Sequence, residues 1–422
     1  MEVIVQKYGG SSLATPAHIQ RCAERVARSR EAGRAIIVVV SAMGGVTNRL
    51  LGLTRDICPH GERREIDRVL ATGEQTAAAL VAMALRSRGI TAQSIEPAAI
   101  GMTASPTLFG ATIDGMDPSH LHALVEQGIT PVVPGFQALT EHGDIVTLGR
   151  GGSDTTATVI AAAWQWQYGG AQCEINTDVV GVHTADPNLV PEARCLDWVS
   201  YDAMMELAYA GARVINPQAV EHAAHASVPI MVRHAHLAGG GTVIRPQSSN
   251  DAWLPGPAIA LLRDVVPWSI CNDALTLPMI EAFRAVLAHR GIRPVIDQVT
   301  DEPGTPLRLH VACRERESSG VAQAIAEVIP TLGQQDVTMG PALAVLTTMF
   351  DQRNASLVDE SIGRALQRLW ITPRATLLRP SRRLDLIDVD CADDAVRAVH
   401  DAIVSTATSS GTPASDPQSR AM

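Results

Sequence analysis

The stretch VIVQKYGGSS, residues 3–12, joins an apolar, strand-like segment to a turn rich in glycine and serine. Glycine lets a backbone approach a ligand closely, and amide N–H groups that lead into a helix favour anionic oxygens. A similar turn, residues 41–47, follows the apolar run at residues 35–40, and a third spans residues 149–156. Ligands of open α/β sheets bind at the carboxyl ends of parallel strands, so the three turns together predict one site for an anionic ligand. None of them matches the P-loop or the full GxGxxG pattern.

Around these turns, residues 1–245 alternate apolar strands with amphipathic helices, which predicts an α/β domain with a mainly parallel sheet. Thr15 followed by proline predicts the start of one helix, and a longer helix is expected after Gly73. The Pro/Ser/Asn/Gly-rich residues 246–257 are typical of a linker.

Two stretches of similar layout follow the linker, residues 258–335 and 336–404. Each predicts a small α+β module in the order strand, helix, strand, strand, helix. Residues 405–422 are rich in Ser, Thr and Pro, which predicts a disordered tail.

The composition excludes several classes of protein. A net charge of −10 argues against a nucleic-acid partner, and no apolar stretch reaches the length of a membrane helix. Seven scattered cysteines without a CxxC pair predict neither a disulfide framework nor a zinc site. We therefore expect a soluble cytoplasmic protein.

Lys7 is the only lysine of the chain, because every other residue in the Lys+Arg total of 34 is arginine. A GC-rich genome explains the arginines but not the one lysine that remains. Lysine is a compact point charge that suits some phosphate sites better than a planar guanidinium does. We infer that Lys7 has a functional role.

Other polar residues of the turns suit phosphoryl transfer, which needs positioning and cationic stabilisation. Arg150 offers a planar fork for a carboxylate. Asp154 can orient Lys7 or help bind magnesium, or it is a plain helix-start acid. Glu74 can bind an ammonium group, or it is a surface residue in the first turn of a helix.

The motifs KYGGSS, VVVSAMGGVTN, ATGEQ, TLGRGGSDTTA, NTDVVGVHTADPN and ARVINPQAVE resemble those of aspartate kinases, in the amino acid kinase superfamily. The resemblance implies a three-layer αβα catalytic domain over residues 1–245, followed by two ACT-like modules. It implies transfer of phosphate from ATP, with Mg²⁺, to the side-chain carboxylate of L-aspartate, giving 4-phospho-L-aspartate for amino-acid biosynthesis. It further implies a homodimer.

The resemblance also assigns roles by motif. Those expected to be catalytic are Lys7, Arg150 and Asp154. Those expected to bind the amino acid are Ser41, Thr47, Glu74, Arg150, Gly151, Gly152 and Ser153. Those expected to bind the nucleotide are Lys7, Tyr8, Gly9, Gly10, Asn176, Thr177, Asp178, His183, Thr184, Asp186, Pro187 and Arg213.

Some positions depart from the family pattern. Val180 replaces an aspartate and His183 a tyrosine, while RVINPQ stands where the family has KVLHPR. These changes leave open a kinase for an aspartate analogue, or a catalytically silent regulatory paralogue. Both predicted effector loops, at residues 271–277 and 349–354, lack the family's glycine turn, so we expect weak or altered feedback.

Four histidines near the end of the first domain invite a metal hypothesis: His222, His225, His234 and His236. No cysteine or acidic residue completes a familiar ligand spacing, so no metal site is predicted there.

Overall fold

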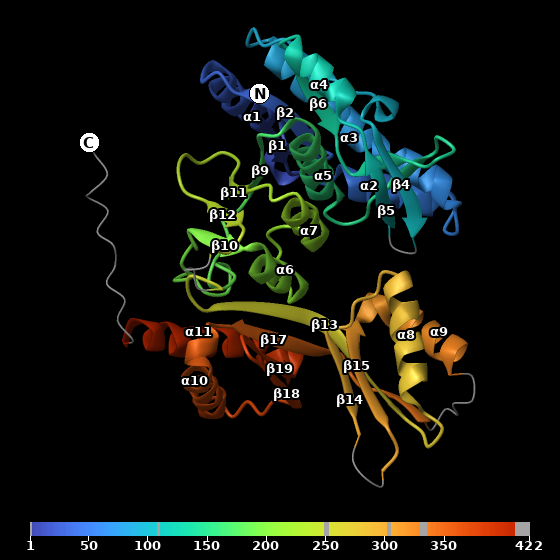
Figure 1. Ribbon diagram of the computed structural model, residues 1–422, viewed down its shortest axis with the longest axis vertical. Helices are drawn as coiled ribbons and strands as arrows, with labels where there is room; N and C mark the ends of the chain where they lie inside the picture. The colour runs from blue at the N-terminus through green and yellow to red at the C-terminus, as the bar shows by residue number, and fades with distance from the viewer. Residues whose placement is uncertain (1, 108–109, 249–252, 302–304, 330–335, 410–422) are drawn as a thin grey trace.

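The computed structural model describes residues 2–107, 110–248, 253–301, 305–329 and 336–409. Figure 1 shows two halves, an N-terminal half (residues 2–245) and a C-terminal half (residues 258–409), which meet along strand β13. No helix in these ranges is long and apolar enough to cross a membrane.

The N-terminal half contains twelve strands and seven α-helices in its described residues. The strands are β1 (Val3–Tyr8), β2 (Ala35–Val40), β3 (Ala92–Ser94), β4 (Met102–Thr107), β5 (Gly110–Met116), β6 (Thr130–Pro134), β7 (Gln137–Leu139), β8 (Ile145–Thr147), β9 (Ala171–Thr177), β10 (Trp198–Ser200), β11 (Ile230–His234) and β12 (Thr242–Arg245). The helices are α1 (Pro16–Glu31), α2 (Val46–Ile57), α3 (Arg63–Arg86), α4 (Ser119–Glu126), α5 (Gly152–Tyr168), α6 (Tyr201–Tyr209) and α7 (Pro217–His225).

Eight of these strands form one sheet in the order β10-β12-β11-β9-β1-β2-β6-β3. All its pairings are parallel except β11 with β12, so the prediction of a mainly parallel sheet is confirmed. Strands β1 and β2 lie in the middle and are buried along their whole length, which explains their continuous apolar sequences.

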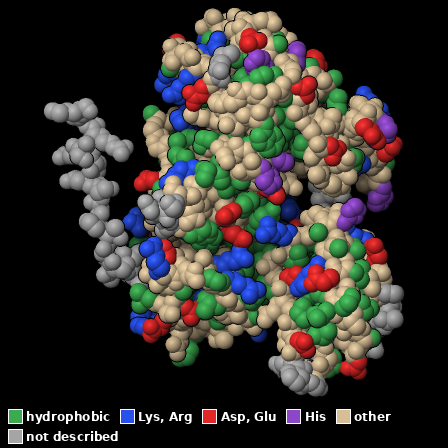
Figure 2. Space-filling view, viewed as in Figure 1, with side chains coloured by type: hydrophobic (Ala, Val, Ile, Leu, Met, Phe, Trp, Pro, Cys, Tyr) green, Lys and Arg blue, Asp and Glu red, His purple; other side chains and the backbone are tan. Residues whose placement is uncertain are grey.

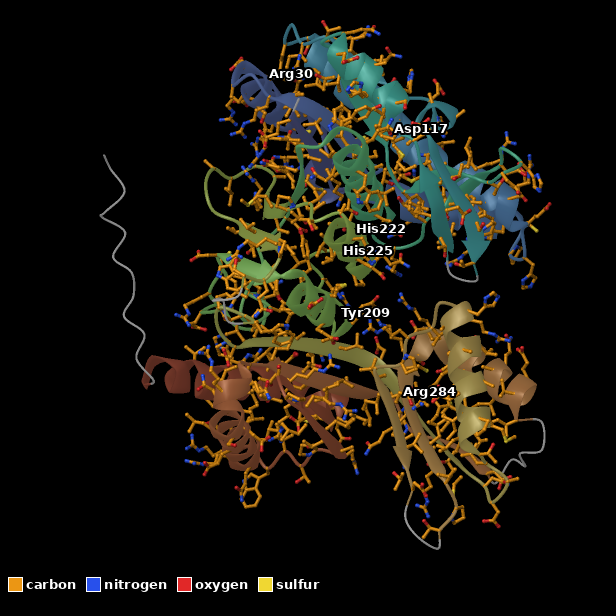
Figure 3. All side chains as sticks on the ribbon, in the orientation of Figure 1. Arg30, Asp117, Tyr209, His222, His225 and Arg284 are labelled. Carbon is orange, nitrogen blue, oxygen red and sulfur yellow. The ribbon has the colours of Figure 1, made fainter. Side chains whose placement is uncertain are left out.

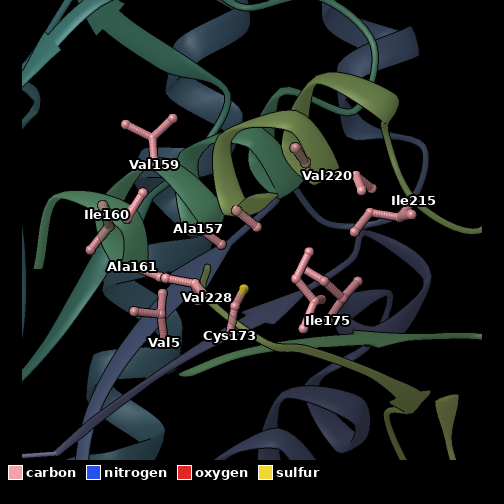
Figure 4. Packing of buried hydrophobic residues seen from close by; sticks show 14 of the residues in the cluster. Val5, Ala157, Val159, Ile160, Ala161, Cys173, Ile175, Ile215, Val220 and Val228 are labelled. Atoms are coloured by element: carbon pink, nitrogen blue, oxygen red, sulfur yellow. The ribbon is translucent and has the colours of Figure 1, made fainter. Parts of the chain in front are cut away.

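Alternate side chains of the central strands enter two separate cores. Val3 and Val5 of β1 pack with α5 and α7, whereas Ile4 and Tyr8 pack with α1 and α3. Figure 4 shows the first core, with Val5 on its strand facing helix α5. Helices therefore cover both faces of the sheet, and the expected three-layer αβα arrangement is confirmed.

Two predicted helix starts have different outcomes. The Thr15 hydroxyl accepts a hydrogen bond from the His18 N–H (3.2 Å) and α1 begins at Pro16, as predicted. The long helix α3, however, begins at Arg63, so the prediction of a start after Gly73 is wrong. Gly73 lies inside α3 because the helix packs closely there: a Cβ atom would lie 2.9 Å from the Ala42 side chain.

A second sheet of four strands, in the order β5-β4-β7-β8, was not predicted. It changes the setting of the third glycine-rich turn. That turn follows β8, which pairs antiparallel with β7, so it does not follow a parallel strand of the central sheet. Phe136, with a φ of +70°, bends the chain between β6 and β7 and directs it away from the central sheet.

The C-terminal half forms one seven-stranded sheet with helices packed on it. Its elements are β13 (Ala258–Cys271), α8 (Leu277–His289), β14 (Ile296–Thr300), β15 (Arg308–Arg314), α9 (Ser318–Val328), β16 (Val337–Met339), β17 (Leu343–Met349), α10 (Ala355–Arg368), β18 (Ala375–Arg379), β19 (Arg382–Ile387) and α11 (Ala392–Ser409). The order strand, helix, strand, strand, helix occurs twice, as predicted.

Strand pairing divides this half differently from the predicted boundaries. The first part of β13, from Ala258 to Leu262, pairs with β17, Val265 pairs with both β17 and β15, and the residues from Val266 to Cys271 pair with β15. Strand β16 returns to pair with β13, so residues 337–339 belong to the first module's side of the sheet. One long strand thus serves both modules, and a division at residue 335 does not follow the strand pairing.

The predicted linker and tail are only partly covered by the described residues. Residues 249–252 and 410–422 lie outside them. Of the linker, Leu254 is 2% exposed and packs in the core of the N-terminal half. Helix α11 continues to Ser409, although the disordered tail was expected to begin at residue 405.

Candidate active site

A buried ion pair lies at the centre of the site. The Lys7 ammonium, near the end of β1, lies 2.6 Å from Oδ1 of Asp154 in the first turn of α5. The two residues are 8% and 7% exposed. The structure therefore places two of the three residues expected to be catalytic in direct contact.

The first two glycine-rich turns pack backbone against backbone beside this pair. The Gly9 N–H donates to the Asn176 carbonyl at the end of β9 (3.3 Å). A Cβ atom at Gly10 would lie 2.9 Å from the Ala42 carbonyl oxygen. Glycine is required at position 10 because any side chain would push the two turns apart.

The third turn reaches the same place from the small sheet. Gly149 and Gly151 have φ values of +78° and +72°, a conformation that favours glycine. A Cβ atom at Gly135, directly after β6, would meet the Ser153 side chain at 2.9 Å, so the turn lies against the end of the central sheet. Arg150 at its tip is exposed.

Glu74 is buried in the middle of α3 and does not lie in the first turn of a helix. Its Oε1 accepts a hydrogen bond from the Ala42 N–H (2.9 Å), while its Oε2 is buried without a partner. Burial raises the pKa of the Glu74 carboxyl to about 7, against a lowering by the Ala42 hydrogen bond. A buried carboxylate with one free oxygen suits a cationic ligand group.

Other buried polar atoms near these turns also lack partners. The side-chain amide of Asn176, opposite Tyr8 in the sheet, has neither its nitrogen nor its oxygen paired, and the Ser12 hydroxyl is unpaired too. Buried polar groups in proteins are nearly always hydrogen-bonded, so the unpaired groups next to the glycine-rich turns are available to a ligand.

The predicted nucleotide segment divides into two groups. Thr177 and Asp178 continue directly from Asn176, and the Thr177 hydroxyl donates to the Asp178 carboxylate (3.1 Å). Thr184 instead contacts the C-terminal half: its hydroxyl lies 2.9 Å from Nε2 of His400, and its carbonyl accepts from the Ile259 N–H. The Asp186 carboxylate accepts from Asn188 in its own turn.

The remaining predicted residues are placed as follows. Ser41 and Thr47 flank the second turn and are half-buried, and Gly152 packs against the Leu148 side chain. The His183 ring contacts the Gly181 carbonyl, and Pro187 is half-buried beside Asp186. The structure thus brings Lys7, Gly9, Gly10 and Asn176 together. The later residues of the segment, His183, Thr184, Asp186 and Pro187, contact other parts of the chain or their own turn.

Positive charge gathers where the site meets the C-terminal half. Burial lowers the pKa of the Arg314 guanidinium, and the nearby charges of Arg316, Arg213 and Arg150 lower it further, against a raising effect of the Glu317 carboxylate. On the face seen in Figure 2, side chains of both charges line the junction of the two halves. A concentration of arginines at this place suits anionic groups such as phosphates.

The four histidines of the metal hypothesis do not gather at one place within the described residues. His222 and His225 lie on α7 (Figure 3), and burial lowers the pKa of the His222 imidazole. His236 lies beside His234, with ring centroids 6.0 Å apart, and it also stacks on His18 of α1, with ring centroids 4.7 Å apart. Within the described ranges, no three His, Cys, Asp or Glu side chains are grouped as metal ligands.

Three contact residues were missed as site residues in the sequence. Ala42 supplies a backbone donor, Gly135 makes room for Ser153, and Asn216 contacts the third turn. Ala42 and Gly135 contribute through a backbone group and close packing, which residue type does not reveal, whereas Asn216 contributes through its side-chain amide. Asn216 gave one signal, its departure from the family pattern.

Comparisons with known proteins identify the family of this chain. The sequence model of the amino acid kinase family matches residues 2–234. The chain is 43% identical over 409 residues to an aspartokinase of Thermus thermophilus, covering 95% of this chain and 98% of that one. It is 39% identical over 292 residues to an aspartokinase of Geobacillus stearothermophilus, covering 69% and 71%.

The fold is also shared with solved structures. Escherichia coli aspartokinase III, in complex with aspartate and ADP, superposes with a TM-score of 0.79 at 22% identity, over 96% of this chain and 100% of that one. An aspartate kinase of Clostridium acetobutylicum superposes with a TM-score of 0.67 at 18% identity, over 95% and 100%. The chain belongs to the amino acid kinase family and, within it, to the aspartokinases.

Proposed function

We propose that this chain transfers the γ-phosphoryl group of ATP to the side-chain carboxylate of L-aspartate and releases 4-phospho-L-aspartate and ADP. The observation that carries the proposal is the buried Lys7–Asp154 ion pair, which lies where the three glycine-rich turns converge. This combination supplies a fixed cation and backbone donors, which are the groups that stabilise a transferring phosphoryl group.

Each end of the reaction has its own residues. Lys7, Gly9 and Gly10 bind the phosphates of ATP, and Asp154 holds the Lys7 ammonium in place. The unpaired amide of Asn176 lies beside Gly9 and is free to bind the nucleotide. Phosphates that enter here replace the missing hydrogen-bond partners.

On the substrate side, Glu74 binds the aspartate ammonium through its unpaired Oε2. Arg150 binds a carboxylate of the same molecule, while Ser41, Thr47 and the backbone of residues 151–153 shape the pocket. One anionic and one cationic residue therefore select a zwitterionic amino acid and align its side-chain carboxylate with the γ-phosphate.

Magnesium is expected to arrive with ATP, because Mg²⁺ binds through one or two carboxylates together with substrate phosphates. The exposed Asp178 carboxylate, two residues after the unpaired Asn176 amide, fits as such a ligand. The ion would neutralise phosphate charge there.

We further propose weak feedback by lysine and threonine, because the two candidate effector loops already use their own polar groups. The Asn272 side chain accepts from the Ala274 N–H (2.7 Å) and donates to Asp336 (2.8 Å). Asp351 accepts three hydrogen bonds from Arg353, through its backbone N–H, Nε and Nη2. The homodimer also remains a proposal.

Trapping with hydroxylamine over a panel of amino acids tests the function, because hydroxylamine converts an acyl phosphate into a stable hydroxamate. The expected result is hydroxamate and ADP in equal amounts from L-aspartate, with little from glutamate or succinate. Hydroxamate from an aspartate analogue but not from aspartate would identify a different substrate, and no ATP turnover with any carboxylate would identify a silent paralogue.

A further inference from the structure

Asn216 lies between the buried Ile215 and the first turn of α7, whose N-terminus it caps. Its Oδ1 accepts a hydrogen bond from the Gln218 N–H (2.8 Å). Capping alone needs only this oxygen, and Ser, Thr or Asp would serve as well. The other polar groups of Asn216 face the active site.

Those groups contact the third glycine-rich turn at three points. The Asn216 Nδ2 donates to the Arg150 carbonyl (2.5 Å), and its backbone N–H donates to Oδ2 of Asp154 (3.4 Å). Between them, a Cβ atom at Gly151 would lie 2.5 Å from Nδ2 of Asn216. One residue therefore touches the turn that carries Arg150 and the carboxylate that holds Lys7.

The segment that carries Asn216 is itself held from the other side. A Cβ atom at Gly211, whose φ is +115°, would lie 2.4 Å from the Leu261 carbonyl oxygen of β13. The Tyr209 carbonyl, at the end of α6, accepts from Arg314 (3.5 Å), and Figure 3 shows Tyr209 where the two halves meet. Contact with the C-terminal sheet on one side therefore restrains the segment, so that Asn216 can hold the third glycine-rich turn on the other side.

We propose that Asn216 is a positioning residue of the phosphoryl transfer: its side-chain amide fixes the Arg150 turn against the Lys7–Asp154 ion pair. The inference rests on the proposed function. Asn216 itself touches no reacting atom. It acts by holding Arg150 where the substrate carboxylate binds, and by holding Asp154 at the distance that aims the Lys7 ammonium.

The proposal depends on the Asn216 Nδ2 group, so the test variants keep an oxygen that caps α7 and remove the N–H donor to the Arg150 carbonyl. Asn216→Ser retains a capping oxygen but is too short to reach the Arg150 carbonyl. Asn216→Asp retains shape and cap, but it replaces the donor with an oxygen that repels both the Arg150 carbonyl and Asp154. Ser200→Ala is the matched control, because Ser200 caps α6 through the Ala203 N–H without contact to the turn.

The measurement is kcat, the KM for aspartate and the melting temperature of the full chain for wild type and all three variants. We expect both Asn216 variants to melt close to wild type, with kcat lowered at least about tenfold and a raised KM for aspartate, the scale of a small misplacement of reacting groups. Ser200→Ala should melt earlier with kcat unchanged.

The outcomes separate this inference from the function on which it rests. Wild-type values of kcat and KM in Asn216→Ser, with active wild type, would overturn the inference alone. Early melting of both Asn216 variants with normal kcat would reduce Asn216 to a structural cap and overturn it as well. An inactive wild type would overturn the proposed function first.

Discussion

Two buried ion pairs, one in each half, look alike but have different surroundings. In the N-terminal half, the Lys7 ammonium contacts a single oxygen of Asp154 (2.6 Å). In the C-terminal half, the Arg383 guanidinium of β19 donates to both oxygens of Asp385 (2.8 Å each) and to Asp359 (2.9 Å). Arg383 is as buried as Lys7, at 8% exposure.

The difference lies in how each cation is paired and in the kind of groups beside it, since the Thr348 hydroxyl opposite Arg383 also lacks a partner. The carboxylates of Asp385 and Asp359 accept hydrogen bonds from all three guanidinium nitrogens of Arg383, so no ligand is needed to pair them. Around Lys7, by contrast, Glu74 and Asn176 keep buried polar atoms without partners, beside glycines that leave room. The Arg383 guanidinium is fully paired by carboxylates of the chain, whereas the Lys7 ammonium lies among groups that are available to a ligand, as its proposed catalytic role requires.

The largest expected effect concerns the structural pair. Arg383→Ala leaves Asp385 buried without its guanidinium, and we expect the free energy of unfolding to fall by about 3–5 kcal/mol. Denaturant unfolding measures this, while kcat per folded molecule should stay unchanged. Arg353→Ala, at an exposed pair, is the control and should unfold nearly as wild type does. A loss of kcat in folded Arg383→Ala would remove the distinction between the two pairs.

Lys7→Arg should lower kcat and leave stability nearly unchanged, the reverse of the result expected for Arg383→Ala. A planar guanidinium does not fit between glycine-rich backbone and phosphate, so we expect kcat to fall by at least about 10²-fold, as when one preorganised stabilising group is lost. The melting temperature should stay near that of wild type, because arginine keeps the charge opposite Asp154. Near-normal turnover of the folded variant would show that a lysine at position 7 is not needed for catalysis.

The proposed role of Glu74 predicts that aspartate binding depends on pH. With its pKa raised to about 7, Glu74 becomes neutral at lower pH and loses its attraction for the substrate ammonium. We expect the KM for aspartate to rise about tenfold per pH unit below 7. A flat KM between pH 8 and 6 would exclude Glu74 from substrate binding.

The same pKa predicts a stability effect with a definite sign. Folded Glu74 holds its proton more tightly than the unfolded chain does, so its contribution to stability is present at low pH and is lost as pH rises through about 7. Glu74→Gln should therefore melt later than wild type at pH 8 and show no such gain at pH 5. Thermal melting at both pH values checks this.

The smallest expected effect is that of lysine and threonine. At millimolar concentration, each should change the initial rate less than about twofold, because a ligand that must displace Arg353 or Asp336 gains little net free energy. Initial rates over a range of effector concentrations measure this. Steep cooperative inhibition by either amino acid would show that the effector loops are open to ligands.

The sequence predicts features that depend on local patterns better than features that depend on contacts between distant residues. The parallel strands, the start of α1 and the order of elements in both modules followed from apolar patterns and turn residues, which act locally. The start of α3 did not, because Gly73 serves a close contact with Ala42 from a distant turn. Nor did the division of β13 between two modules, since pairing of strands remote in sequence leaves no local signal.

The same limit applies to the site. Lys7, Asp154 and the glycines were predictable because their chemistry depends on residue type and motif. The contacts of Thr184 with His400, and of Asn216 with Arg150, depend on how the two halves and the α7 segment pack. Tertiary contacts of this kind decide which motif residues remain open to a ligand.

Calorimetric binding of aspartate and of succinate, which lacks the ammonium group, tests most directly whether the unpaired buried groups receive the substrate. At pH 8, with ADP and Mg²⁺ present, wild type should bind aspartate at least about tenfold more tightly than succinate, because only the ammonium completes the hydrogen bonding of Glu74. In Glu74→Gln this preference should largely disappear. An equal preference in both proteins would contradict the assignment.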